Sequence, residues 1–210
     1  MNKYFITGIG TDVGKTVAAA IVVESLKADY WKPVQAGELQ HTDTHSVEEL
    51  ISNSTSAMHD HSYALQTPMS PHAAADIDGI QINLAAIKEP ETDNHLVIEG
   101  AGGLLVPLNE QDTILDLIKN KGYEIALIMI GGLNYYTGQA YDMEKITEMG
   151  HKMGCMVGFD CAHGAGNVNL DLHNSGADFA VWCTYKYLNA GPGSLSGCFI
   201  HERHAYNKSL

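Results

Sequence analysis

A glycine-rich loop close to the N-terminus constrains the fold of this chain more than any other sequence feature. Residues 8–16 read Gly-Ile-Gly-Thr-Asp-Val-Gly-Lys-Thr and follow a short apolar run at 4–7. Residues 16–26 are rich in alanine and valine and contain neither glycine nor proline, which predicts a helix. A strand, a glycine-rich turn and a helix N-terminus form an anion cradle, because their backbone N–H groups point at bound phosphates. The sequence therefore predicts a nucleotide-phosphate site at residues 8–16.

The spacing within this loop differs from the strict phosphate-loop pattern. Gly8 lies six residues before Gly14, where the pattern Gly-x-x-x-x-Gly-Lys-Thr has five. A glycine-rich turn with an incidental lysine is therefore the alternative interpretation. The strand-loop-helix context favours nucleotide binding, in which Lys15 supplies a mobile positive charge and the Thr16 hydroxyl suits Mg²⁺.

Strands and helices alternate along the chain. Apolar runs predict strands at 4–7, 29–34, 95–99, 124–130, 156–159 and 179–183, with a weaker strand at 197–201. Helices are predicted at 16–26, 46–52, 113–120 and 142–153, and residues 80–87 are amphipathic. This alternation predicts an α/β fold similar to that of P-loop NTPases, a parallel sheet with helices on both faces. Ligands of such sheets bind at the carboxyl ends of the strands.

Length and charge limit the classes of function. A chain of 210 residues has room for one α/β domain, so residues 1–210 are predicted to form a single domain. The net charge of −13 argues against a nucleic-acid partner, and no uninterrupted apolar run is long enough for a membrane span. The N-terminus enters a strand directly, which is not the form of a signal peptide. The chain is therefore expected in the cytoplasm.

Five segments in the first part of the chain carry a resemblance to one enzyme family. They are, in order, the loop at 8–16, Trp-Lys-Pro-Val-Gln-Ala-Gly at 31–37, Thr-Asp at 42–43, Ser-Pro-His-Ala-Ala at 70–74, and Val-Ile-Glu-Gly-Ala-Gly-Gly at 97–103 with Val-Pro-Leu at 106–108. In this order they resemble dethiobiotin synthetase, which closes a ureido ring in biotin synthesis at the expense of ATP. The resemblance covers residues 1–124.

This resemblance implies the substrates and the site residues. The substrates are 7,8-diaminononanoate, CO₂ and ATP, and the metal is Mg²⁺. Catalytic roles fall to Lys15, Lys32 and Asp12. Thr16, Asp43 and Glu99 are the implied Mg²⁺ ligands, an all-oxygen set that suits this ion. The implied nucleotide-binding residues lie mostly in the glycine-rich loop and are Gly10, Thr11, Asp12, Val13, Gly14, Lys15, Thr16, Val17, Glu99 and Gly102. Ala36 departs from the family, where a hydroxyl residue is often found.

After about residue 125 that pattern ends and a second resemblance begins. Gly-Phe-Asp-Cys-Ala-His at 158–163, Trp-Cys-Thr-Tyr-Lys-Tyr-Leu-Asn at 182–189 and Gly-Pro-Gly at 191–193 are similar to segments of kynureninase, a pyridoxal-phosphate enzyme. This resemblance covers residues 127–204. It implies that Asp160 pairs with the pyridinium nitrogen, that His163 lies near the ring, that Tyr185 contacts the phosphate, and that Lys186 forms the Schiff base.

The meeting of the two resemblances indicates a chimera, with a dethiobiotin synthetase-like part at 1–124 and a kynureninase-like part at 125–210. The strand at 125–130 fits both parents, so one parallel sheet is expected to continue across the join. Three functions compete: an ATP- and Mg²⁺-dependent cyclo-ligase, a pyridoxal-phosphate-dependent kynureninase-like hydrolase fragment, and a folded chimera without turnover. The ligase is favoured, because its phosphate and metal groups are complete before residue 125. Both families are typically dimeric, so a homodimer is expected.

Overall fold

The chain divides into two compact units. The computed structural model describes residues 1–8, 14–123 and 127–205. Its units are Met1–Glu124, called unit 1, and Ile125–Leu210, called unit 2. The division falls at the position where the two resemblances meet. That residues 1–210 form a single domain stays a prediction.

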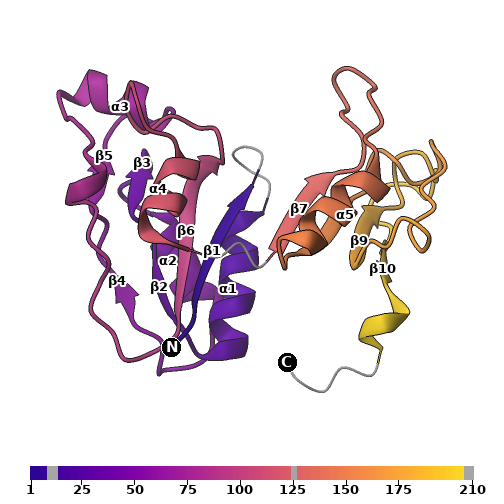
Figure 1. Ribbon diagram of the computed structural model, residues 1–210, viewed down its shortest axis with the longest axis horizontal. Helices are drawn as coiled ribbons and strands as arrows, with labels where there is room; N and C mark the ends of the chain where they lie inside the picture. Colours follow the sequence, from indigo (N-terminus) through magenta and orange to yellow (C-terminus); the bar gives the residue numbers. More distant parts are fainter. Residues whose placement is uncertain (9–13, 124–126, 206–210) are drawn as a thin grey trace. The chain divides into compact units, whose positions relative to one another are not determined.

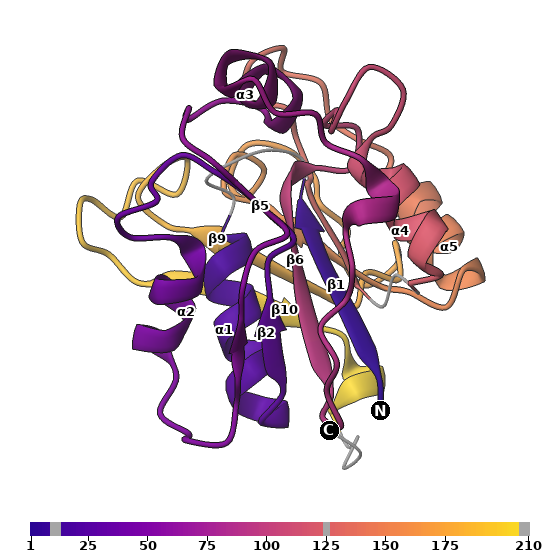
Figure 2. The ribbon, with the colours of Figure 1, turned by 90° about the vertical axis from the view of Figure 1, so that its left-hand side faces the viewer.

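Unit 1 is built on a parallel sheet with the strand order β1-β6-β2-β4. Its strands are β1 (Lys3–Gly8), β2 (Asp29–Trp31), β4 (Met58–His59) and β6 (Leu96–Gly103), and β3 (Val34–Ala36) pairs with β5 (Tyr63–Leu65) in a separate two-stranded sheet. Its helices are α1 (Lys15–Leu26), α2 (Asp43–Leu50), α3 (Pro71–Asp78) and α4 (Ile114–Lys121), with a 3-10 turn η1 (Leu84–Ala86). β1 and β6 run side by side in both views (Figure 1 and Figure 2).

Helices cover both faces of the unit 1 sheet. On one face, Tyr30 and Val97 pack with Ala19, Ala20 and Val23 of α1 in one buried cluster. Successive strand residues point to opposite faces. On the other face, the Phe5 ring stacks on Tyr123 with centroids 5.6 Å apart, and a Cβ on Gly100 would lie within 3.4 Å of both Phe5 and Ile114 of α4. The predicted α/β fold, a mostly parallel sheet with helices on both faces, is confirmed.

Local chemistry moves several element boundaries from their predicted positions. The strand predicted at 29–34 is split into β2 and β3, because Pro33 has no N–H to donate and restricts the backbone of Lys32. The helix predicted at 46–52 begins earlier, at Asp43, since Thr42 caps it in a reciprocal arrangement with His45. The amphipathic segment at 80–87 forms only the 3-10 turn η1. The break at Pro33 matters most, because it places Lys32 between two strands.

Unit 2 has a sheet of its own, with the order β10-β9-β8-β7. Its strands are β7 (Leu127–Gly131), β8 (Met156–Asp160), β9 (Phe179–Cys183) and β10 (Ser196–Ile200), of which β10 runs antiparallel to β9 and the other pairs are parallel. α5 (Met143–Lys152) connects β7 to β8, and a 3-10 turn η2 (Glu202–His204) follows β10 (Figure 1). The described strands therefore do not form the one continuous sheet that the sequence predicts. No helix of the described ranges is long and apolar enough to cross a membrane.

A buried carboxylate links three segments of unit 2. Asp178 Oδ2 accepts a hydrogen bond from the backbone N–H of Val157 at 2.7 Å and lies 2.7 Å from Nε2 of His151 in α5, while its Oδ1 lies 2.8 Å from Nε2 of His204 in η2. Burial opposes ionisation of Asp178, but the Val157 N–H and the two imidazoles together hold its pKa below the usual value. Asp178 thus joins β8, α5 and η2.

Replacing this carboxylate should destabilise unit 2. We expect Asp178→Asn to lower the free energy of unfolding of unit 2 by about 2–4 kcal/mol at pH 7, because an amide cannot satisfy the same donors. The folded-state pKa is lowered, so the contribution is complete above about pH 4 and is lost as the pH falls through the folded pKa. Urea unfolding followed by Trp182 fluorescence, in a Trp31→Phe background, measures it. The exposed Asp171→Asn is the control, and equal effects at pH 7 would contradict the prediction.

Candidate functional site

Four predicted site residues of unit 1 meet at one place. The Thr16 hydroxyl donates to Glu99 Oε1 at 3.0 Å and to Asp43 Oδ1 at 3.2 Å. The Lys32 ammonium lies 2.5 Å from Asp43 Oδ2 and 3.0 Å from Glu99 Oε1. Thr16, Lys32, Asp43 and Glu99 are called the Lys32 cluster below. These residues come from α1, the β2–β3 connection, α2 and β6, so the fold gathers side chains that are distant in sequence.

The strand register explains why these residues meet. Trp31 of β2 lies opposite Ile98 of β6, so the next residues along the parallel strands, Lys32 and Glu99, are neighbours. Ile6 of β1 lies opposite Glu99, so the carboxyl end of β1 lies at the same end of the sheet. α1 begins there, with Gly14 before it at φ +82°, a conformation that favours glycine. The cluster therefore lies at the carboxyl ends of the strands, where ligands of such sheets bind.

The charges of the cluster are held in a buried environment. The side chains of Lys32 and Glu99 are 5% and 1% exposed. Burial opposes ionisation of Asp43, but the charge and hydrogen bond of Lys32, with help from Thr16 and Lys15, hold its pKa below the usual value. One buried lysine thus pairs with two carboxylates, of which Glu99 is buried and Asp43 is partly exposed. Such a group is strongly coupled, because removing any one charge leaves the others uncompensated.

The donor set of the cluster fits Mg²⁺. Among the residues that the structure describes, no three His, Cys, Asp or Glu side chains group together as a metal site. Mg²⁺ does not require such a group, since proteins usually hold it through one or two carboxylates, water and substrate phosphates. Thr16 supplies a hydroxyl, and Asp43 and Glu99 each place a carboxylate oxygen within hydrogen-bond distance of it. The chemistry of the predicted ligand set is therefore consistent with this ion.

The other predicted nucleotide-binding residues are only partly described. Gly10, Thr11, Asp12 and Val13 lie outside the described residues. Lys15 is the first residue of α1 and is 9% exposed, and the Val17 side chain, one half-turn later, is 53% exposed. Gly102 lies near the end of β6 at φ +76°, where a Cβ would approach Val106 to 2.9 Å. Gly14 and Lys15 thus lie at the start of α1, next to Thr16 of the cluster.

One residue of this site was not predicted from the sequence. Tyr30 of β2 is fully buried, and its hydroxyl donates to Glu99 Oε2 at 2.9 Å. The segment Asp-Tyr-Trp at 29–31 contains no motif. The period of a strand is a usable signal, because Tyr30 and Lys32 are two residues apart and so face the same side.

The predicted pyridoxal-phosphate residues lie in unit 2. Lys186 Nζ is 2.9 Å from Nε2 of His163, and the Tyr135 ring stacks on His163 with centroids 5.4 Å apart and an interplanar angle of 25°. Asp160 ends β8, and its Oδ1 accepts a hydrogen bond from the N–H of Ala162 at 2.8 Å. The Tyr185 side chain is half exposed, with Lys186 Nζ 5.9 Å from its ring centroid. The structure thus pairs Lys186 with His163, while Asp160 stabilises its own turn.

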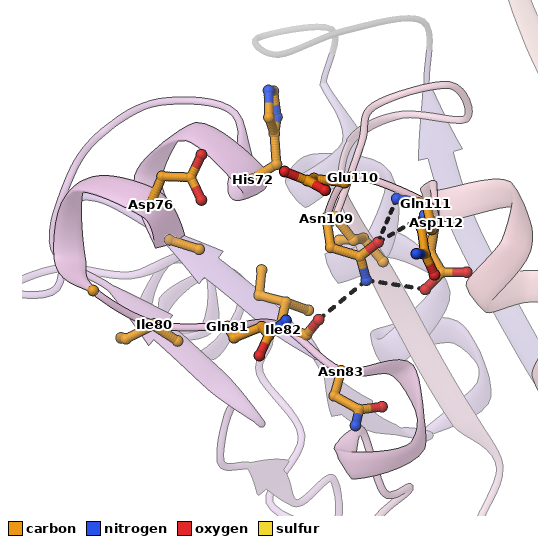
Figure 3. A pocket seen from close by; sticks show the side chains of 13 residues that line it. His72, Asp76, Ile80, Gln81, Ile82, Asn83, Asn109, Glu110, Gln111 and Asp112 are labelled. Carbon is orange, nitrogen blue, oxygen red and sulfur yellow. Dashed lines mark hydrogen bonds between the residues drawn. The ribbon is translucent and has the colours of Figure 1, made fainter.

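A separate hollow of about 600 Å³ lies in unit 1, between α3, residues 79–83 and the turn at 108–112 (Figure 3). Its lining includes the side chains of His72, Asp76 and Glu110. Asn109 connects two of its walls, since its amide donates to the Ile82 carbonyl at 3.1 Å and to Asp112 Oδ2 at 2.9 Å. No residue of the Lys32 cluster lines this hollow, so it is distinct from the candidate site.

Comparison with known proteins shows which family the first part of the chain matches. A family model described as AAA domain matches residues 2–146. The chain is 57% identical over 136 residues to the ATP-dependent dethiobiotin synthetase BioD of Christiangramia forsetii, covering 64% of this chain and 66% of that protein. It is 47% identical over 149 residues to the corresponding protein of Cytophaga hutchinsonii, covering 69% of this chain and 72% of that one. The chain belongs to the dethiobiotin synthetase family.

The C-terminal part of the chain is similar to proteins of a second family. A family model described as aminotransferase class-V matches residues 105–198. The kynureninase of Myxococcus xanthus is 61% identical over 99 residues, which cover 47% of this chain and 23% of that protein. The chain therefore combines parts of two families, as the sequence predicts. It spans 66% of the length of the Christiangramia synthetase and less than a quarter of the kynureninase.

Proposed function

We propose that this chain binds Mg-ATP at residues 8–16 and the Lys32 cluster, and uses it to close the ureido ring of dethiobiotin. The substrates are 7,8-diaminononanoate and CO₂. The observation that carries the proposal is the convergence of Thr16, Lys32, Asp43 and Glu99 within 3.2 Å contacts at the start of α1. A lysine beside two carboxylates and a hydroxyl is suited to phosphoryl transfer, which depends mainly on positioning and on neutralisation of charge.

The reaction has three bond-forming steps. One amine of the substrate adds to CO₂ and loses a proton, which forms a carbamate. A carbamate oxygen attacks the γ-phosphorus of ATP and ADP leaves, which gives a mixed carbamic–phosphoric anhydride. The second amine attacks the carbonyl carbon and loses a proton, phosphate leaves, and the ring closes.

The residues of the chain have distinct parts in these steps. Lys15, at the N-terminus of α1, contacts the phosphates and the carbamate, and Lys32 neutralises the carbamate and the charge that develops in the transition state. Asp12, in the loop, contacts the substrate amine. Gly10, Thr11, Val13, Gly14, Val17 and Gly102 surround the nucleotide. Thr16, Asp43 and Glu99 hold Mg²⁺, which neutralises phosphate charge when it is bound.

Two further proposals follow from the family. The chain acts in the cytoplasm and forms a homodimer. The part that follows residue 124 differs from that of the synthetases, so we expect turnover to be weaker than in a full-length relative and nucleotide selectivity to be altered.

A kynureninase-like hydrolase fragment is the second candidate. The contact between Lys186 and His163 favours it, because it brings together two of the predicted pyridoxal-phosphate residues, the Schiff-base lysine and the histidine near the ring. The chain spans only 23% of the kynureninases, however, and Asp160 is engaged with the N–H of Ala162. A folded chimera without turnover is the third candidate.

One assay separates the three candidates. The purified chain is incubated with 7,8-diaminononanoate, ¹⁴C-bicarbonate and Mg-ATP, and in parallel with kynurenine and pyridoxal phosphate. We expect labelled dethiobiotin, one phosphate released per ring, loss of product with EDTA, and no hydrolysis of kynurenine above background. Lys186→Ala, the matched control, should retain ring closure. Kynurenine hydrolysis that requires Lys186 would support the second candidate, and absence of both products would support the third.

A further inference from the structure

Tyr30 contacts the Lys32 cluster from the core of unit 1. Its hydroxyl donates to Glu99 Oε2 at 2.9 Å, whereas Oε1 of the same carboxylate accepts from both Thr16 and Lys32 at 3.0 Å. The two oxygens of Glu99 are therefore divided between two environments. Oε2 is bound to a core residue, and Oε1 faces the residues of the proposed metal and phosphate site.

The Tyr30 ring is held independently of Glu99. It is fully buried and packs in a cluster with side chains of α1 and α2, namely Ala19, Ala20, Val23 and Val47. Its backbone is fixed as well, because Tyr30 lies opposite Val97 in the β2–β6 pair and its N–H donates to the Ala57 carbonyl at 2.9 Å. The position of the hydroxyl is thus determined by the sheet and the core.

The Tyr30 hydroxyl is the donor in its contact with Glu99. Burial, and then the negative charges of Glu99 and Asp43, raise the pKa of the phenol well above its usual value. An ionised carboxylate accepts hydrogen bonds and does not donate them. The hydrogen bond between Tyr30 and Glu99 therefore has one direction, from the hydroxyl to Oε2.

A carboxylate needs such a contact to keep one orientation. The terminal torsion of a glutamate side chain is broad and roughly two-fold, so packing alone does not fix the plane of its oxygens. Groups that hydrogen-bond to a metal-ligating carboxylate orient it, and their loss typically lowers metal affinity about 10–100-fold. Thr16 and Lys32 both act on Oε1, which leaves Tyr30 to hold Oε2.

We infer that Tyr30 is a positioning residue, which fixes the plane of the Glu99 carboxylate so that Oε1 faces Thr16 and is available to Mg²⁺. The inference rests on the proposed function, because it concerns the orientation of a proposed metal ligand. Tyr30 itself contacts neither the substrate nor the metal.

The test is Tyr30→Phe, which keeps the ring and removes the hydroxyl. Thermal stabilisation by a non-hydrolysable ATP analogue is measured as a function of Mg²⁺ concentration, and Mn²⁺ binding is followed by electron paramagnetic resonance. We expect the half-saturating metal concentration to rise about 10-fold. At saturating metal, the thermal stabilisation by the nucleotide analogue should change less than two-fold. Tyr63→Phe is the control, because the Tyr63 hydroxyl contacts the N–H of Asn83 and no cluster residue. It should leave the metal dependence unchanged.

A double-mutant cycle distinguishes positioning from a loss of stability. In a Glu99→Gln background, Tyr30→Phe should have no further effect on the metal dependence. If Tyr30→Phe does not fold, Tyr30→Met also removes the hydroxyl and fills the core with a flexible apolar chain. Equal metal dependence in the wild type and the folded variant would overturn this inference and leave the proposed function intact. If the wild type itself shows no Mg²⁺-dependent response to the nucleotide, the proposed function and the inference both fail.

Discussion

Lys15→Ala is expected to abolish the stabilisation of unit 1 by Mg-ATP and to reduce ring closure about 10³-fold. Lys15 is the first residue of α1, and its charge reaches the Lys32 cluster, where it helps to lower the pKa of Asp43. At a ligand concentration of about 100 Kd, the wild type should gain about 2.7 kcal/mol from the nucleotide. Without the lysine charge that faces the phosphates, this gain should disappear.

Differential scanning fluorimetry with and without Mg-ATP measures this effect. The matched control is Lys88→Ala, which removes an exposed lysine of the same unit outside the motifs. It should show the thermal shift of the wild type. A Lys15→Ala variant that keeps the full shift would exclude the glycine-rich loop as the nucleotide site, because the lysine is the one cation that the phosphate-loop pattern itself supplies.

Lys32→Met should have the largest effect on stability. It leaves the buried Glu99 and the partly exposed Asp43 without their shared cation, so we expect the free energy of unfolding of unit 1 to fall by about 3–5 kcal/mol at pH 7. Ring closure should also be lost, since no charge remains to neutralise the carbamate. Urea unfolding followed by Trp31 fluorescence, in a Trp182→Phe background, measures the stability.

The pH dependence of the stability loss shows whether it arises from the unpaired charges. In the wild type the pKa of Asp43 is lowered, so its stabilising contribution is complete above about pH 4 and is lost as the pH falls through the folded pKa. The difference between wild type and variant should therefore be largest at neutral pH and shrink as the pH falls, because acid first protonates the unpaired carboxylates of the variant and then the paired Asp43 of the wild type. A difference that is constant with pH would indicate loss of packing instead.

Two companion variants separate charge from shape. Lys32→Arg keeps the positive charge and should retain most of the stability, but its planar fork does not reproduce the point charge of an ammonium, so turnover should stay low. Adding Glu99→Gln to Lys32→Met removes one of the two unpaired charges and should restore part of the lost stability. Strictly additive losses would show that the two side chains do not act as a pair.

The sequence singled out the four residues of the Lys32 cluster because each of them belongs to a local motif. The loop at 8–16 marks the start of α1 and with it Lys15 and Thr16, and Lys32 lies in the motif at 31–37. Most of the longer strands and helices were also predictable, since apolar periodicity reports which elements are buried, but α3, β4 and β5 were not predicted. The break between β2 and β3 was not predicted, although proline supplies its cause.

Other features could not be predicted because they depend on distant partners. The hydrogen bond from Tyr30 to Glu99 spans 69 positions, and the ion pair from Lys32 to Glu99 spans 67. Only the parallel register of β2 on β6 brings these residues together. In unit 2, the sequence matches a cofactor-binding aspartate at Asp160, yet its carboxylate accepts from the Ala162 N–H, a contact that a motif does not report.

The sequence by itself determined the ancestry of both parts, the α/β class of the fold and the change of family near residue 125, because motifs and periodicity are local properties of a chain. The tertiary structure decided which atoms meet: it gave the two carboxylates of the cluster one shared lysine, added Tyr30 behind Glu99, and gave each unit its own sheet. These outcomes arise from strand register and burial, which act between residues far apart in sequence and have no counterpart in any local segment.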